Sequence, residues 1–134
     1  MSASLSACTE KELSQLTKAH KIDKHPYFLV ALHGKTDRKT KKRVFSEVAQ
    51  LKRANLTHVF VVMHAKEDKR INRRSAKKHG GVCLEGLNPS ELVALCAHAE
   101  FALGNRYHLL YLAKRADVPI IVYGDDPKLI SLRE

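Results

Sequence analysis

The residues best suited to chemistry lie close together near the C-terminus, around a single glycine. Gly104 ends a short apolar run, and Asn105, Arg106 and His108 follow it. Glycine lets the backbone turn sharply and lets a ligand come close to it. A helix that begins here would present unpaired N–H groups and the positive end of its dipole. Together with a planar guanidinium and an imidazole, this arrangement predicts a site for a carboxylate or a phosphate.

The same side chains also have a purely structural interpretation. Arg106 could pair with a surface acid, and His108 could be a half-buried histidine with satisfied hydrogen bonds, because an isolated Arg-x-His pair is weakly specific. An acid and a base, Asp126 and Lys128, stand in a loop after the last apolar run. Lys128 would either neutralise a phosphate or pair with Asp126 and hold the loop, and pairing is the favoured interpretation.

Length and composition restrict the class of protein. The chain has 134 residues of which 44% are hydrophobic, which is enough for one domain with a buried core. No apolar run approaches the roughly 18 residues of a membrane span, and no apolar signal core precedes the first strand, so a soluble, cytoplasmic protein is expected. The three cysteines, Cys8, Cys83 and Cys96, lack metal-ligand spacing. They are expected to be buried thiols, and no metal or cofactor is predicted.

The formal net charge of +10 is concentrated in two blocks of lysine and arginine. The first block is Lys35, Arg38, Lys39, Lys41, Lys42 and Arg43, and the second is Lys66, Lys69, Arg70, Arg73, Arg74, Lys77 and Lys78. Such blocks attract polyanions, anionic lipid surfaces or acidic proteins, or they are solvated helix faces. Nucleic acid is the less favoured partner, because no aromatic residues are interleaved to stack bases.

Apolar runs alternate with helical patterns along the chain. The runs predict strands at residues 27–32, 58–63, 82–84, 101–103 and 119–123. Helical spacing predicts helices at residues 44–51, 67–78, 88–99 and 106–116, with Asn88 as a cap and Pro89 in the first turn. The 67–78 helix has little apolar stripe, so it should be short or lie at the surface. Residues 1–25 are interpreted as an N-terminal helix or a linker remnant.

Five apolar strands separated by helices predict a single α/β domain over residues 26–134, a Rossmann-like parallel sheet with helices on both faces. Ligands of such sheets bind beyond the carboxyl ends of the strands. The polar segments at that edge are His33-Gly34-Lys35, His64, Glu85-Gly86, Gly104-Asn105-Arg106 and Gly124-Asp125-Asp126. The edge is therefore a candidate substrate-binding rim that includes His33 and His64. Glycine motifs of dinucleotide-binding and P-loop proteins are missing from the sequence.

The C-terminal third also resembles a known family. Residues 87–95, 99–113 and 118–122, followed by Asp126-Pro127-Lys128, are similar to the C-terminal domain of polysaccharide pyruvyl transferases. These enzymes have two domains of the glycosyltransferase B architecture and transfer a pyruvyl group from phosphoenolpyruvate to a sugar, forming a ketal. The resemblance implies that Arg106 holds the donor carboxylate or phosphate and that His108 is the acid, since protonation of the enol carbon needs an acid and a charge clamp.

The resemblance also implies partners. They are phosphoenolpyruvate, a sugar or nucleotide-linked saccharide acceptor, and a second domain, subunit or copy of the chain to complete the cleft. Two alternatives stay open: a glycosyltransferase half-domain that binds a nucleotide sugar, and a non-catalytic basic module that binds a polyanion such as RNA or a protein. A steep salt dependence would mark the basic module, because release of counterions drives polyanion binding.

Overall fold

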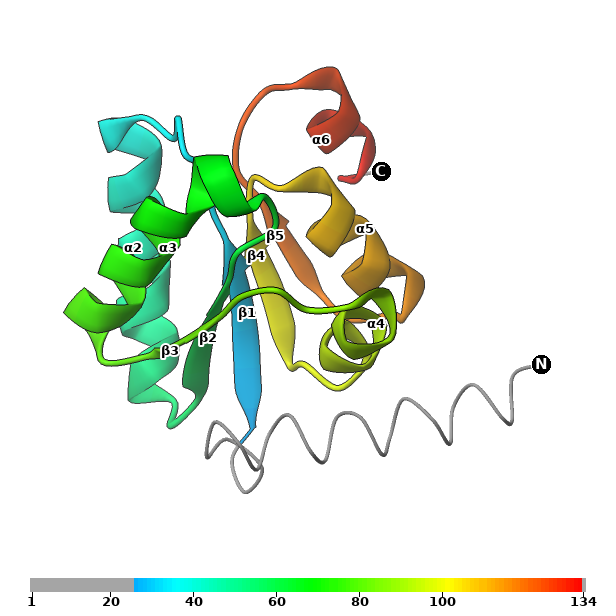
Figure 1. Ribbon diagram of the computed structural model, residues 1–134, viewed down its shortest axis with the longest axis horizontal. Coiled ribbons are helices and arrows are strands. Elements are labelled where there is room, and N and C mark those ends of the chain that lie inside the picture. Colours follow the sequence, from blue (N-terminus) through cyan, green and yellow to red (C-terminus); the bar gives the residue numbers. More distant parts are fainter. Residues whose placement is uncertain (1–25, 134) are drawn as a thin grey trace.

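The computed structural model describes residues 26–133, which fold around one five-stranded parallel sheet (Figure 1). The strands are β1 (Tyr27–Ala31), β2 (Thr57–Val61), β3 (Val82–Leu84), β4 (Phe101–Gly104) and β5 (Ile120–Val122). Their order in the sheet is β3-β2-β1-β4-β5, and every neighbouring pair is parallel. The predicted Rossmann-like α/β fold is therefore confirmed. Residues 1–25, predicted as a helix or linker, lie outside the described residues.

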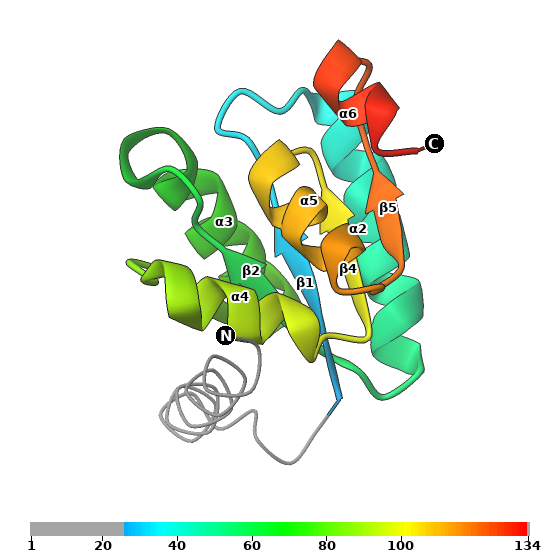
Figure 2. The same cartoon turned by 90° about the vertical axis from the view of Figure 1, so that its right-hand side faces the viewer.

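Helices cover both faces of this sheet. They are α2 (Arg38–Arg53), α3 (Ala65–His79), α4 (Pro89–Ala97), α5 (Tyr107–Arg115) and α6 (Pro127–Ser131). Helices α2 and α3 lie on one face, and α4 and α5 lie on the other (Figures 1 and 2). None of the helices described between residues 26 and 133 has the length and apolarity that crossing a bilayer requires.

The sheet separates the core into two clusters, one on each of its faces. Side chains alternate along a strand, so Leu29 of β1 packs with α4 and α5 while Phe28 and Val30 pack with α2 and α3. All five residues of β1 are buried. This two-sided burial explains why the strand has a continuous apolar sequence rather than an alternating one.

Helix starts follow local sequence signals. The side chain of Asp37 accepts a hydrogen bond of 2.7 Å from the Thr40 N–H and caps α2. Asn88 and Glu91 form a reciprocal capping box at α4, with Pro89 in the first turn, so the predicted start of this helix is confirmed.

Two expectations about local structure need correction. Helix α3 lies at the surface, as one of the two alternatives held, but it is not short: it has 15 residues, and its inner face is buried and carries the polar residues Asp68, Asn72 and Ser75 beside Ala76. The lack of an apolar stripe did not indicate an unburied helix, because the polar groups on this buried face are paired by hydrogen bonds. The segment predicted as a loop at residues 125–128 contains the start of α6, and Asp126 is its N-cap.

The two cysteines in the described residues are free thiols. Cys96 is buried and Cys83 is half-buried, so the expectation of burial is met fully only by Cys96. Burial raises the pKa of Cys96 to about 12 and that of Cys83 to about 11. Both therefore stay protonated at neutral pH and are poor nucleophiles. Cys8 lies outside the described residues.

Candidate functional site

The candidate site lies at the point where the sheet reverses its winding. Strands β1 and β4 are neighbours, but the chain continues from β1 toward β2 and from β4 toward β5, in opposite directions. A crevice opens beyond the carboxyl ends at such a point. Here it is a pocket of about 420 Å³, built by the segments that follow β1, β4 and β5. Its lining is His33, Lys35, Thr36, Asn105, Arg106, Tyr107, Gly124, Asp125, Asp126, Lys128 and Leu129.

Gly104 makes the tight exit from β4 possible. Its φ is +140°, and a Cβ at this position would lie 2.2 Å from the carbonyl oxygen of Ala31. No side chain fits there, which confirms that this turn requires glycine. Gly104 is buried and does not line the pocket itself; it brings the next residues to the rim.

Asn105 joins the two central segments of the pocket. Its Oδ1 accepts a hydrogen bond of 2.8 Å from the His33 N–H, and its Nδ2 donates one of 3.0 Å to Thr36 Oγ1. The segment after β1 is thereby fixed against the segment after β4. Asn105 accordingly positions the pocket wall, whether or not it also contacts a ligand.

Arg106 forms an ion pair inside the protein. Nε donates to Asp68 Oδ2 at 2.6 Å, and Nη2 donates to Asp68 Oδ1 at 2.7 Å and to Glu67 Oε2 at 3.1 Å. The hydrogen bonds to Asp68 raise the pKa of the Arg106 guanidinium above its ordinary value. Arg106 therefore pairs with an acid, as the purely structural interpretation of the sequence held. That acid, Asp68, is fully buried and does not lie at the surface. The Nη1 group makes no hydrogen bond within residues 26–133 and is the part of the guanidinium left for a ligand.

Asp68 connects three of the segments at the carboxyl edge. Besides Arg106, its carboxylate accepts hydrogen bonds from the N–H groups of Gly34 at 3.0 Å and His64 at 3.2 Å. One turn later, Asn72 exchanges two hydrogen bonds with the backbone of Leu32, at 3.0 and 3.2 Å. Sequence reasoning missed both residues. The available signal was their spacing of four on a helix that lacks an apolar face.

His33 is held in a single orientation. Its Nδ1 accepts a hydrogen bond of 3.0 Å from the Lys35 N–H, so the proton of the neutral ring is on Nε2. Nε2 lies 3.6 Å from Glu67 Oε2. This distance is beyond that of a hydrogen bond, so the Nε2–H group is available to donate to a carboxylate or phosphate.

Three of these side chains also have the composition of a metal site. One polar atom each of His33, Glu67 and Asp68 lies within 4.8 Å of the others. However, the Asp68 oxygens already accept four hydrogen bonds, and Arg106 supplies the compensating positive charge. A cation would have to displace that guanidinium, so this donor set does not fit a metal as it stands.

Two lysines supply the remaining positive charge of the pocket. Lys35 follows β1 and Lys128 follows β5, on either side of the β4 segment. Neither forms an ion pair with any residue in the range 26–133. The predicted pairing of the Lys128 and Asp126 side chains does not occur; instead the backbone N–H of Lys128 donates a hydrogen bond of 2.9 Å to Asp126 Oδ1, which caps α6. The ammonium group is thus left for a ligand.

The other predicted residues do not meet in the pocket. His64 is exposed and caps α3, where its Nδ1 accepts a hydrogen bond of 3.3 Å from the Glu67 N–H. His108 is exposed on the first turn of α5 and does not line the pocket. At the far end of the same edge, Glu85 pairs with Arg73. The structure therefore brings together His33, Asn105, Arg106, Asp126 and Lys128, and leaves His64 and His108 outside.

Comparison with known proteins establishes the fold. No family model and no curated protein matches this chain. Among solved structures, one match is the crystal structure of Methanocaldococcus jannaschii UDP-GlcNAc 2-epimerase in complex with UDP-GlcNAc and UDP, at a TM-score of 0.57 and 16% sequence identity. The match covers 90% of this chain and 37% of the epimerase. The chain thus shares its fold with part of that epimerase and spans 37% of its length.

Proposed function

We propose that the pocket at the carboxyl ends of β1, β4 and β5 binds phosphoenolpyruvate, as one half of a transferase that acts on a saccharide. The observation that carries this proposal is the pair of lysines on separate segments. Lys35 and Lys128 flank the β4 segment, and the first turn of α5 begins between them with Arg106 as its N-cap. A small ligand with two anionic groups, a carboxylate and a phosphate, matches two separate cations around a helix N-terminus.

The sequence resemblance selects the donor. In pyruvyl transfer the methylene carbon of phosphoenolpyruvate takes a proton, two sugar hydroxyl groups add to the adjacent carbon, and phosphate leaves. In this proposal the lysines and Nη1 of Arg106 hold the anionic groups. His108, exposed on the first turn of the same helix, supplies the proton from the open side once a second domain or subunit closes the cleft.

A nucleotide sugar is the second candidate ligand. The comparison structure favours it, because the epimerase was crystallised with UDP-GlcNAc and UDP. A diphosphate would use the same lysines and the same helix N-terminus. The two candidates differ in the carboxylate, which only phosphoenolpyruvate has, and in the base and sugar, which only the nucleotide sugar has.

A calorimetric titration of the whole chain distinguishes them. The ligands are phosphoenolpyruvate, UDP-GlcNAc, pyruvate and inorganic phosphate. The test variant is Lys35→Gln/Lys128→Gln, and the control is Lys39→Gln/Lys42→Gln, which removes the same charge from exposed positions of α2 outside the pocket. Phosphoenolpyruvate should bind more tightly than pyruvate or phosphate alone, and the test variant should lose at least about tenfold in affinity.

Saturable binding of UDP-GlcNAc without binding of phosphoenolpyruvate would replace the first candidate by the second. Binding that falls equally in both variants would mean a response to net charge, and the proposed pocket would be wrong. Absence of binding for both ligands would also reject it.

A further inference from the structure

The positive charge of this protein gathers on one face of the sheet. Seven of its 24 lysines and arginines lie on α2 and another seven on α3, and these two helices carry just three of its fourteen acids. Both helices cover the same face (Figures 1 and 2). The pocket at the carboxyl edge uses none of these fourteen cations.

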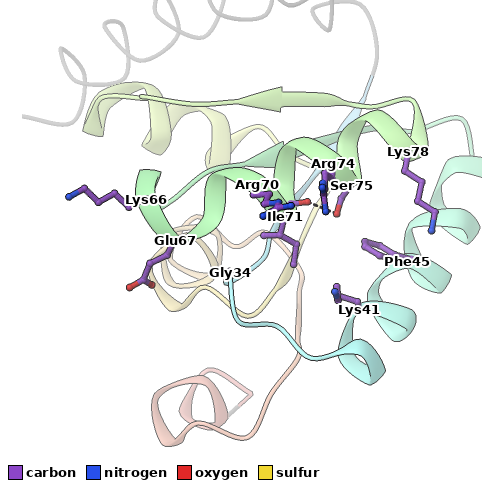
Figure 3. A pocket seen from close by; sticks show the side chains of 10 residues that line it. All are labelled: Gly34, Lys41, Phe45, Lys66, Glu67, Arg70, Ile71, Arg74, Ser75 and Lys78. Atoms are coloured by element: carbon purple, nitrogen blue, oxygen red, sulfur yellow. Dashed lines mark hydrogen bonds between the residues drawn. The ribbon is translucent and has the colours of Figure 1, made fainter.

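A groove lies between the two helices, with a volume of about 430 Å³ (Figure 3). Five cations line it: Lys41 from α2, and Lys66, Arg70, Arg74 and Lys78 from α3. Its apolar side chains are Phe45 and Ile71, with Lys41 and Lys78 beside the ring of Phe45 (Figure 3). The groove therefore combines a row of cations with an apolar part.

The four cations of α3 have a regular spacing of four residues. A helix rises about 1.5 Å per residue, so successive cations are about 6 Å apart along the axis and the row is about 18 Å long. This is a linear array of like charges rather than a cluster around one point. Only a partner with several negative charges in sequence can neutralise it, since one small anion would meet one or two of the cations.

The acids nearest this row pair with other cations. Glu67 also lines the groove, but its carboxylate pairs with Arg106, as does that of Asp68, and Glu85 pairs with Arg73. Of the groove cations, none forms an ion pair with a residue in the part of the chain that the structure describes. Since like charges at a spacing of four destabilise a helix slightly, the row is a cost to the fold that a bound polyanion would remove.

We propose that the groove between α2 and α3 binds the phosphodiester backbone of a single-stranded nucleic acid, a function beyond that of the pocket. A concave channel between two helices admits one extended strand, whereas an anionic membrane is flat. Phe45 is the one aromatic residue that lines the groove, so the groove has no series of rings on which successive bases could stack. Binding is thus to the backbone, without sequence preference, and depends steeply on salt.

Fluorescence anisotropy with a labelled 15-nucleotide oligouridine tests the groove. The test variant Lys41→Gln/Arg70→Gln/Arg74→Gln removes cations from both walls, and the control Lys39→Gln/Lys42→Gln/Arg53→Gln removes the same charge from α2 outside the groove. The wild-type chain should show a slope of log affinity against log salt of about −3, as expected for four to five phosphate contacts. The test variant should lose at least tenfold in affinity and flatten that slope, while the control stays within about threefold.

Competing polyanions identify the partner. Unlabelled single-stranded RNA and DNA of the same length should compete, and their ratio tells which sugar is preferred. Polyglutamate, duplex DNA and vesicles of phosphatidylserine should compete poorly at equal charge concentration. The proposal would be overturned if any of these three competed more strongly than single-stranded RNA and DNA. It would also be overturned by an equal loss of affinity in the two variants, or by no binding of oligouridine. Thermal melting of each variant confirms that it is folded.

Discussion

Arg106 shows how one side chain can satisfy a sequence motif and still have another role. Its position after Gly104 is the one predicted for an anion clamp, yet most of its donors are used by Asp68 and Glu67. The paired carboxylate is fully buried, while the Arg106 side chain is 22% exposed. Removal of one partner from a buried pair leaves an uncompensated charge, which is much more costly than the pair itself.

This pair gives a first prediction about stability. Arg106→Met should lower the free energy of unfolding by about 3 kcal/mol or more, because the Asp68 carboxylate stays buried without its counter-charge. The exposed pair of Arg73 and Glu85 provides the control: Arg73→Met should destabilise the protein far less, because water screens an exposed ion pair. Urea unfolding measures both. The double variant Asp68→Asn/Arg106→Met should be more stable than Arg106→Met alone, and the opposite order would contradict the argument.

His58 gives a prediction about pH. It is buried at the start of β2, and its Nε2 donates a hydrogen bond of 2.6 Å to the His79 carbonyl. Burial lowers the pKa of His58 below its usual value of about 6.5 and also lowers that of His79. As the pH falls, the unfolded chain therefore takes up protons on these histidines before the folded chain does. Their contribution to the free energy of unfolding is fully present above about pH 6.5 and is lost below it.

The free energy of unfolding should thus be smaller at pH 5.5 than at pH 7.5. His58→Gln removes one of the two titrating rings and should reduce the difference between the two pH values, whatever its effect on stability at pH 7.5. His98→Gln, at an exposed position, should keep the wild-type difference. An unchanged difference in His58→Gln would show that other groups dominate this pH range.

At the scale of elements, the connection from β4 to α5 decides whether the pocket forms. Gly104→Ala would place a Cβ 2.2 Å from a backbone oxygen at a φ of +140°, so the strand ends would have to separate. Gly86→Ala is the matched comparison: its φ is +64°, and nothing lies within 4 Å of the added Cβ. Gly86→Ala should cost about 1 kcal/mol, the strain of the left-handed conformation alone, and Gly104→Ala should cost severalfold more. Chemical denaturation of both variants is the measurement, and equal losses would show that β1 and β4 separate easily.

Helix α3 marks the limit of reasoning from periodicity at this scale. Its length follows from its composition and from the glycine that ends it, but its burial rests on Asp68 and Asn72. Hydrophobic pattern detects only faces that bury apolar surface. A face that is buried through hydrogen bonds to neighbouring strands is identified only when those strands are in place.

For the whole molecule, the sheet order makes β1 the most protected element. It pairs with β2 on one side and β4 on the other, and its core residues Phe28, Leu29 and Val30 are 0% exposed. Hydrogen–deuterium exchange followed by mass spectrometry should find the slowest amides in β1 and faster ones in the edge strands β3 and β5. Faster exchange in β1 than in β3 would contradict this sheet order.

The sequence by itself determined the class of this protein: five apolar strands, the helices between them, the capping of α4 and the glycine turn before Arg106. These features depend on contacts near in the chain, or on burial alone, and each leaves a local pattern. The tertiary structure decided which residues meet. Sheet order places the segments after β1, β4 and β5 around one pocket, pairs Arg106 with Asp68, 38 residues away, and leaves His64 and His108 outside. Parallel strands can be paired in several orders with the same apolar pattern, so no local signal could have made that choice.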